Sequence, residues 1–233
     1  MNYNDLKKLR LDFRAWILAK AENDKEYYKV LEALNVAEKY HSDNRKDGSP
    51  TMIHQMSIVQ YLKTMVHVIE KPVDVFVAAL LHDTYEDYPE SFFELKEKFP
   101  KQLEYIIRVS KMRYEYNEDG EVVDTVKLSN EKYYSGMAKC PVCSVIKPTD
   151  RIHNVYSMVN VFSHDKQTRY LEEVDDFVLP LIKAAKRLFP QQTPIYENMK
   201  SFLLVKRDLI RNMREQYNLV ADIEQEENLK PGM

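Results

Sequence analysis

The sequence predicts an all-α protein, on the strength of two observations. The 233 residues include only 4 glycines, where an average composition would supply roughly 16. Turn-dense sandwiches and barrels need glycine for left-handed backbone conformations. Apolar residues also recur at helical spacing through most of the chain. We therefore expect a mainly helical bundle.

The first half of the chain is expected to form a series of helices. Residues 73–82 (VDVFVAALLH) are apolar nearly all round, which is typical of a central buried helix. Residues 41–51 (HSDNRKDGSPT) contain the turn residues of a polar loop. An apolar stripe over 6–17 predicts a first helix. The remaining helices are expected over 28–40, 52–69, 89–99 and 101–110.

The character of the sequence changes over residues 111–128. The segment YEYNEDGEVVDTV alternates on both sides of Asp119-Gly120, which favours a small β-hairpin near 113–126. An exposed loop is the alternative.

Helical spacing resumes near Ser129 and continues to residue 217. The expected helices are 130–138, 141–158, 167–188 with a kink at Pro180, and 194–217. Residues 221–233 have the composition of a flexible, solvated tail. No repeat or linker divides the chain, so we expect one domain over 1–220, with 159–220 as a helical extension.

Composition excludes several classes of function. The glycines are too far apart for the loops that cradle nucleotide phosphates. The net charge of −3 does not favour binding to nucleic acid or to a membrane surface, and no apolar run approaches 18 residues. Two cysteines without a signal peptide favour the cytoplasm. Cys140 and Cys143 lack the second pair that a zinc site needs, so a structural role is favoured over a redox one.

Four ionisable residues follow the most apolar helix. His82-Asp83 closes it, and Glu86-Asp87 lie one helical turn further on. Such a group is costly at the end of a buried helix unless its charge is offset, and a divalent cation is the simplest partner. A solvated acidic turn is the alternative.

Two further residues could join this group. His54 follows the polar loop, where a satisfied core or capping histidine is the alternative. Asp150 lies in VIKPTDRIHNVYSM, whose apolar face could leave it paired only with Arg151 or Lys147.

Taken together, the order His54, His82-Asp83, Asp150 resembles the H…HD…D pattern of the HD superfamily of metal-dependent phosphohydrolases. Two imidazoles and two carboxylates can hold one divalent ion and leave positions open for water and phosphate.

The resemblance extends to the (p)ppGpp hydrolase domain of the RelA/SpoT family, especially its small stand-alone hydrolases of the metazoan SpoT homologue type. It covers about residues 36–158. The segments that carry it are HSDNRKDGSPTMIH (41–54), AALLHDTYED (78–87), VSK (109–111) and VIKPTDRIHN (145–154).

This resemblance implies hydrolysis of the 3′-diphosphate of (p)ppGpp to GDP or GTP and pyrophosphate, without synthetase activity. It implies one Mn²⁺ ion, with Glu86 and Asp87 as the acid/base pair. The implied metal ligands are His54, His82, Asp83 and Asp150. The implied substrate contacts are Arg45 stacked on guanine, Lys46 and Lys147 facing phosphates, and Asn154 near the sugar.

Departures from the family pattern bear on the substrate. Gln55 follows His54 where proline is usual, and Tyr85 and Tyr88 flank the acid/base pair and could reshape the pocket. An HD phosphohydrolase for another nucleotide (a nucleoside monophosphate, a cyclic nucleotide or NADPH) and a non-catalytic nucleotide sensor are therefore alternatives. At their helical spacing, core packing is favoured over a cleft for Tyr133, Tyr134, Tyr156 and Tyr170.

Overall fold

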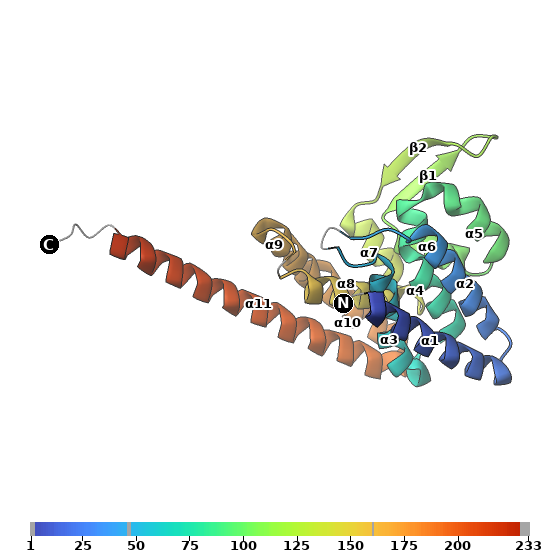
Figure 1. Ribbon diagram of the computed structural model, residues 1–233, viewed down its shortest axis with the longest axis horizontal. Helices are drawn as coiled ribbons and strands as arrows, with labels where there is room; N and C mark the ends of the chain where they lie inside the picture. The colour runs from blue at the N-terminus through green and yellow to red at the C-terminus, as the bar shows by residue number, and fades with distance from the viewer. Residues whose placement is uncertain (1–2, 46–47, 160, 229–233) are drawn as a thin grey trace.

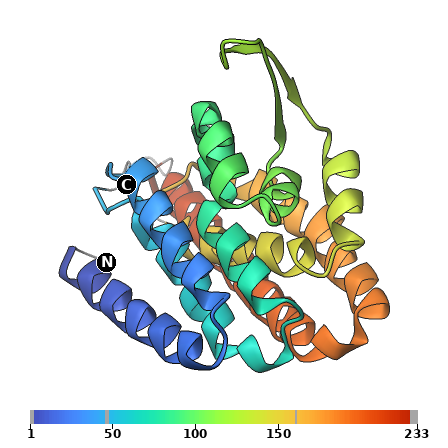
Figure 2. The same cartoon turned by 90° about the vertical axis from the view of Figure 1, so that its right-hand side faces the viewer.

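The most apolar helix of the chain lies at the centre of a helical bundle (Figures 1 and 2). The computed structural model describes residues 3–45, 48–159 and 161–228. Helix α4 is buried along nearly its whole length and contacts four neighbouring helices. These five are α4 (Pro72–Asp87), α2 (Tyr27–Tyr40), α3 (Met52–Thr64), α6 (Leu103–Val109) and α8 (Cys143–Ser157). The expectation of an all-α fold with a central helix over 73–82 is confirmed.

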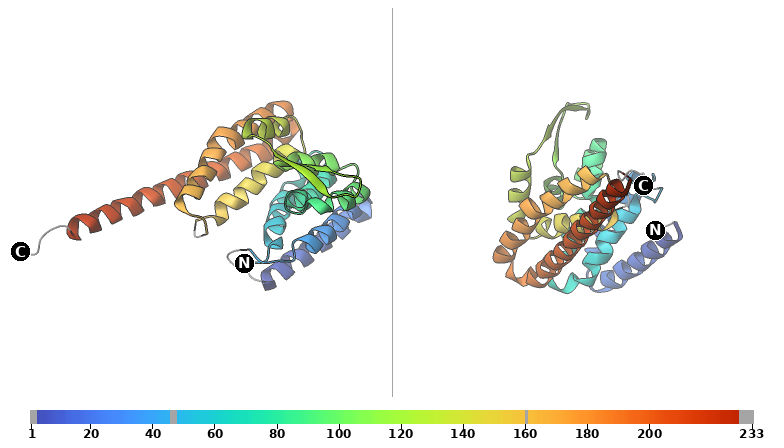
Figure 3. Two further views of the ribbon diagram at one scale, coloured as in Figure 1. Left: turned by 90° about the horizontal axis from the view of Figure 1, so that it is seen from above. Right: turned by 90° about the vertical axis from the view of Figure 1, so that its left-hand side faces the viewer.

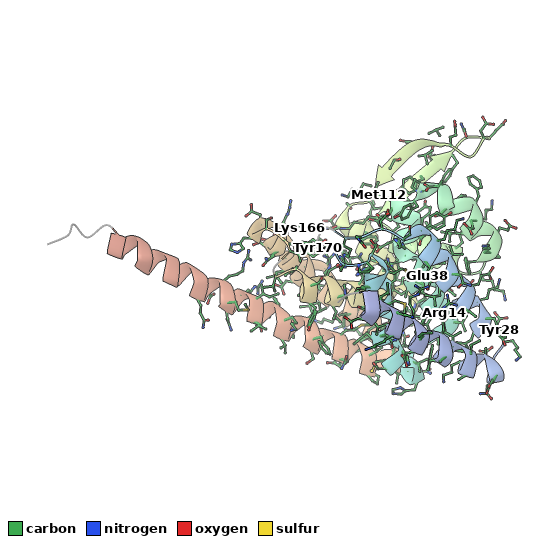
Figure 4. The ribbon with its side chains drawn as sticks, viewed as in Figure 1. Arg14, Tyr28, Glu38, Met112, Lys166 and Tyr170 are labelled. Atoms are coloured by element: carbon green, nitrogen blue, oxygen red, sulfur yellow. The ribbon has the colours of Figure 1, made fainter. Side chains whose placement is uncertain are left out.

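Further helices surround this centre. They are α1 (Tyr3–Asn23), α5 (Phe92–Lys98), α7 (Asn130–Ala138), α9 (His164–Glu173), α10 (Leu179–Leu188) and α11 (Thr193–Asn228), with 3-10 turns at Val66–Val68, Pro89–Ser91 and Pro190–Gln192. Helix α1 is joined to α2 by Glu38, which pairs with Arg10 and Arg14 at 2.6 and 3.2 Å (Figure 4). No helix in the described ranges combines the length and apolarity that crossing a bilayer requires.

The hairpin expected near 113–126 is present. Strand β1 (Met112–Tyr116) pairs antiparallel with β2 (Val122–Lys127), with Met112 opposite Lys127. Gly120 has a φ of +83° in the connecting turn, a conformation that glycine adopts without strain. The hairpin stands out from the bundle beside α5 and α6 (Figure 1).

One predicted helix is divided. The sequence predicts a kinked helix over 167–188, but α9 and α10 are separated by a π-helical turn at Val174–Val178. Pro180 lacks the N–H that would bond the carbonyl of residue 176, and its ring crowds that turn. A wider turn immediately before the proline relieves the crowding. By contrast, α8 continues through Pro148 without interruption.

The last helix is longer than predicted. The spacing predicts a helix over 194–217, whereas α11 continues to Asn228, through most of the stretch expected to be a tail. Its first half packs on α8 and α10, and its second half extends beyond the body of the molecule (Figures 1 and 3).

Candidate metal centre and adjoining cavity

Three helices bring two histidines and an aspartate together. His54 lies in the first turn of α3, His82 in the last turns of α4, and Asp150 in the middle of α8. All three are buried, and one ligand atom from each lies within 4.8 Å of the others. These residues are 28 or more positions apart in sequence, so packing around α4 creates the cluster.

Asp83 completes this cluster on its open side. Its carboxylate oxygens lie 3.0 Å from His82 Nε2 and 3.5 Å from His54 Nε2. The His54 Nε2 atom is also 3.1 Å from Asp150 Oδ1. The Asp83 side chain keeps 30% exposure, against 4% for Asp150. The cluster therefore has a buried floor and one solvent-facing side.

Hydrogen bonds orient the imidazoles. His82 Nδ1 donates to the carbonyl of Ala79 at 2.8 Å, so Nε2 is the nitrogen that faces the carboxylates and carries no proton in the neutral imidazole. That buried Nε2 has no hydrogen-bond partner among the described residues. His54 Nδ1 shares a hydrogen bond of 2.8 Å with His153 Nδ1, which turns His54 Nε2 toward Asp150. Metal-binding histidines are oriented in this way.

Charges within the cluster show what it lacks. Burial disfavours protonation of His82, but the nearby carboxylates of Asp83 and Asp150 outweigh burial and raise its pKa to about 9. Burial opposes ionisation of Asp150, but Lys147 and the histidines hold its pKa well below the usual range. Without a cation, the carboxylates therefore draw a proton onto His82, whose Nε2 has no hydrogen-bond partner among the described residues. A divalent cation would supply this positive charge, so the residues present fit a metal ion.

Lys147 and Asn154 hold Asp150 from the same helix. Lys147 Nζ contacts Asp150 Oδ2 at 2.5 Å, and Asn154 Nδ2 donates to Oδ1 at 2.6 Å. The pairing of Asp150 with Lys147, considered from sequence as an alternative to metal binding, is thus present inside the cluster. Lys147 contacts Asp150 here and no phosphate, so its predicted role toward a substrate stays a prediction.

The two acidic residues at the end of α4 differ in their surroundings. Glu86 Oε2 accepts the N–H of Lys111 at 2.9 Å, and the Glu86 carbonyl accepts the hydroxyl of Tyr114 on β1 at 2.6 Å. Partial burial, followed by repulsion from Asp83 and Glu86, raises the pKa of Asp87 to about 6. Asp87 keeps an exposed surface, so water screens part of this effect. Glu86 is held in place, whereas Asp87 can exchange a proton near neutral pH.

A largely buried ionic network lies next to the cluster and is centred on Glu173. Glu173 on α9 accepts from Arg151 Nη2 at 2.9 Å, Lys111 Nζ at 3.1 Å and the Tyr134 hydroxyl at 2.6 Å. It therefore links the start of the hairpin, α7, α8 and α9. Glu173 is not recognisable from the sequence, because an acid on a charged helix gives no local sign of its partners.

A cavity of about 540 Å³ adjoins the cluster through Asn154. Its wall combines Arg45 from the polar loop with residues of α8 and α9; the other lining residues are Ser157, Val161, Phe162, Ser163, Lys166 and Tyr170. Lys166 Nζ lies 3.6 Å from the Phe162 ring centroid. Lys166 and Tyr170 both belong to α9 and are labelled in Figure 4. Cation and aromatic faces therefore line one wall.

The loop that carries Arg45 is closed on itself. The Arg45 N–H donates to the carbonyl of Ser49 at 2.7 Å, and the Gly48 N–H donates to the carbonyl of Arg45 at 2.9 Å. Gly48 has a φ of +78°, which this tight turn requires. The turn fixes the backbone of Arg45 at the cavity. Lys46, the other predicted contact of this loop, lies outside the described residues.

The tyrosines that stood out in the sequence have different environments. Tyr85 is buried against Phe92 and Tyr114, so it does not narrow the cavity. Tyr133 and Tyr134 lie in the core as expected, whereas Tyr156 is exposed and Tyr170 lines the cavity. For Tyr170, core packing was therefore the wrong choice between the two alternatives. Lys166 and Phe162 are not recognisable from the sequence as possible ligand contacts, because an ordinary amphipathic helix has the same residue types.

Other residues of the motif segments contact neighbouring protein groups and do not line the cavity. His41 Nε2 lies 3.2 Å from the Thr84 hydroxyl, and burial lowers the pKa of His41 to about 4. Gln55, which replaces the usual proline, lies 3.4 Å from Asp83 Oδ2 through its amide nitrogen. Cys140 and Cys143 are free and buried at the start of α8.

The HD domain family model matches residues 30–155, which is more than half of the chain. The chain belongs to the HD domain family. The matched segment contains all of the clustered residues, His54, His82, Asp83 and Asp150, so the buried His-His-Asp group is the metal centre that this HD domain offers.

Named relatives are similar over much of this HD protein. It is 28% identical over 200 residues to guanosine-3′,5′-bis(diphosphate) 3′-pyrophosphohydrolase of Aquifex aeolicus, covering 77% of this chain and 26% of the relative. It is 27% identical over 157 residues to a probable GTP pyrophosphokinase of Mycobacterium leprae, covering 65% of this chain and 18% of the relative. The chain thus spans about a quarter or less of these two relatives.

A solved structure described as "A metazoan ortholog of SpoT hydrolyzes ppGpp and plays a role in starvation responses" superposes with a TM-score of 0.49. It is 20% identical and covers 80% of this chain and 95% of its own.

Proposed function

We propose that this HD protein hydrolyses the 3′-diphosphate of (p)ppGpp, releasing pyrophosphate and GDP or GTP. The observation that carries the proposal is the contact between Asn154 and Asp150. Through Asn154, the cluster of His54, His82, Asp83 and Asp150 shares a wall with a cavity that Arg45 lines. The name of the Aquifex aeolicus relative supports the substrate.

His54, His82, Asp83 and Asp150 would hold one divalent ion, for which we propose Mn²⁺, because imidazoles and carboxylates together suit a borderline ion. When bound, such an ion activates water and stabilises negative charge on a phosphoryl group. The protein's own part is to keep both imidazoles turned with Nε2 toward the carboxylates, which Ala79 and His153 do. Lys147 and Asn154 fix the carboxylate of Asp150.

Proton transfer would fall to the acids at the end of α4. Asp87, with a pKa near 6, can accept a proton from the attacking water and return it to the leaving group. Glu86 is held by the N–H of Lys111 with one oxygen, which leaves the other oxygen to orient the water. Arg45 offers a planar cation for stacking on a purine base, and Lys166 offers charge for a phosphate.

The test is hydrolysis of a nucleotide panel by the purified chain with Mn²⁺. The panel contains ppGpp, pppGpp, a cyclic nucleotide, a nucleoside monophosphate and NADPH, and Asp83→Asn is assayed beside the wild type. We expect pyrophosphate from ppGpp with the wild type and almost none with the variant. If only another compound of the panel is hydrolysed, that compound is the substrate and the (p)ppGpp assignment is wrong. No turnover of any compound would favour a nucleotide sensor.

A further inference from the structure

Glu173, the last residue of α9, accepts from three side chains that come from three other parts of the chain. Its Oε2 atom accepts from Arg151, and its Oε1 atom accepts from Lys111 and from the Tyr134 hydroxyl. Burial raises the pKa of Glu173, but the charge of Arg151 and the other two donors outweigh burial and hold the pKa below its usual value. A buried ionic group of this kind gains little stability over apolar packing. The groups that its partners hold in place therefore matter more.

Lys111 is the partner that reaches the acid/base pair. It lies between α6 and β1, where the chain leaves the bundle for the hairpin. Its backbone N–H donates to Glu86 Oε2 at 2.9 Å, and its carbonyl accepts the N–H of Leu128 at 2.9 Å. Its ammonium group lies 3.1 Å from Glu173 Oε1. Lys111 is therefore held at its backbone by α4 and the hairpin, and at the end of its side chain by α9.

Glu86 depends on this contact more than its neighbour Asp83 does. The carboxylate of Asp83 contacts His54, His82 and Gln55. Among the described residues, the carboxylate of Glu86 makes one hydrogen bond, the one that it accepts from the N–H of Lys111. A carboxylate that is fixed by one donor changes its orientation when that donor moves.

Arg151 connects Glu173 to the wall of the cavity. The guanidinium carbon of Arg151 lies 4.4 Å from the centroid of the Tyr170 ring, and Tyr170 lines the cavity. Tyr170 and Glu173 are three residues apart on α9, so they lie on the same side of this helix. Helix α9 therefore contributes one residue to the cavity and another to the ionic network beside Glu86.

We propose that Glu173 is a positioning residue for Glu86. Its carboxylate fixes the side chain of Lys111, and the fixed lysine presents its N–H to Glu86 Oε2, so the second oxygen of Glu86 keeps one orientation. Because Glu173 belongs to the helix that supplies Tyr170, the acid/base pair is tied to the cavity wall. The role of Glu86 in this inference rests on the proposed function, whereas the connection to Glu173 does not depend on the substrate.

The first test needs no substrate and measures hydrogen exchange of the Lys111 amide by NMR. Glu173→Gln keeps the size of the side chain and removes the charge that holds the lysine. We expect the Lys111 amide to exchange at least about 10-fold faster in this variant, because its bond to Glu86 opens more often. An unchanged exchange rate would overturn the proposal.

Glu94 on α5 offers a matched control, because it also joins two cations and a tyrosine hydroxyl. Its carboxylate accepts from Lys39, Lys98 and Tyr40 at 2.7, 2.8 and 2.9 Å. Glu94→Gln removes the same kinds of contact, so it should lower the melting temperature as Glu173→Gln does. It should leave the exchange rate of the Lys111 amide unchanged. Equal acceleration in both variants would show a loss of stability alone and would refute the positioning role.

The second test is steady-state kinetics with ppGpp and Mn²⁺. We expect Glu173→Gln to lower kcat about 10-fold, with KM and the affinity for Mn²⁺ within a few-fold of the wild type. Lys111→Met keeps the backbone N–H but removes the ammonium group, so it should show the same loss, and Lys111→Arg should recover most of the rate. The Glu173→Gln/Lys111→Met double variant should be no slower than either single variant, because both changes break one connection. Additive losses, or an equal fall of kcat in Glu94→Gln, would contradict the proposal.

The two tests separate this inference from the proposed function. If the wild type hydrolyses no nucleotide while the Lys111 amide responds to Glu173→Gln, the proposed reaction is wrong and the connection is supported. If the wild type hydrolyses ppGpp and Glu173→Gln matches it in both exchange rate and kcat, the reaction stands and the positioning role is wrong.

Discussion

The His-Asp cluster and the cavity that Arg45 lines adjoin each other, yet they are built in different ways. The cluster side chains come from three core helices, and His54, His82 and Asp150 are 5% exposed or less. Neighbouring groups such as Ala79, His153 and Lys147 fix their orientations. The cavity instead uses Arg45 from a loop and residues around the start of α9, which are partly exposed.

Because of this difference, one set of residues can determine the type of reaction while another set determines the choice of substrate. A ligand set held by core packing tolerates little change, so it preserves the type of chemistry. A wall built from a loop and a helix start can change residue by residue without disturbing the core. We therefore expect substitutions in the cluster to abolish turnover and substitutions in the cavity to change affinity.

The largest effect is expected for Asp150→Asn. The change removes a cluster charge and leaves the buried Lys147 without its ion-pair partner at 2.5 Å. We expect kcat/KM to fall on the order of 10³-fold or more, with loss of metal binding by calorimetry. The control, Asp12→Asn, breaks an exposed pair with Lys63 and should change neither quantity. Retained metal affinity in Asp150→Asn would remove Asp150 from the ligand set.

A smaller but still large effect is expected for Asp87→Asn. We expect kcat to fall about 10²–10⁴-fold while metal affinity stays within a few-fold. In the wild type, kcat should fall as the pH drops, because protonated Asp87 cannot accept a proton. The midpoint should lie at or below about 6, since a bound cation favours the carboxylate.

This acid limb should be absent from the pH profile of Asp87→Asn. Glu90→Gln, on the following turn, is the matched control and should keep the limb. An unchanged limb in Asp87→Asn would assign the proton transfer to another group.

For the cavity, Arg45→Ala should raise KM about 10–100-fold, the usual range for loss of one base-stacking contact. The kcat value should change little, because Arg45 lines the cavity and is not one of the proposed metal ligands or proton-transfer residues. Arg45→Lys keeps the charge but not the planar face and should recover only part of the affinity. Steady-state kinetics separates the two constants. A fall in kcat with constant KM would place Arg45 in the chemical step.

The smallest effect is expected for Tyr114→Phe, which tests the link between the hairpin and the cluster. The change removes the hydrogen bond to the Glu86 carbonyl and keeps the ring. We expect kcat to fall about 3–10-fold, as for loss of one hydrogen bond, with KM unchanged. Tyr116→Phe removes a similar bond to the carbonyl of Pro89 and serves as the control. Equal kinetics for both variants would show that the hairpin does not position Glu86.

Much of the fold follows from local patterns. The central helix is recognisable because its residues are apolar on every side, and the hairpin because residues alternate around Asp119-Gly120. The boundaries of two helices differ from the predicted ones, and each difference has a physical cause that the spacing of apolar residues does not show. Pro180 leads to a π turn and two separate helices, and α11 continues through a polar segment where composition predicted a tail.

Residues of the candidate site could be predicted where they belong to a recognisable sequence motif, and not where they do not. His54, His82, Asp83 and Asp150 follow a recognisable order, and the structure brings them together. Glu173 and Lys166 belong to no such pattern, because their importance comes from partners on other helices.

The sequence by itself determined which residues can carry charge and which segments must be buried, because both depend on residue type and spacing. Only the tertiary structure decided the distances, such as the 3.1 Å between His54 and Asp150. It also decided that Tyr85 faces the core and that Tyr170 faces the cavity. Those outcomes depend on how helices distant in sequence pack, which no local spacing specifies.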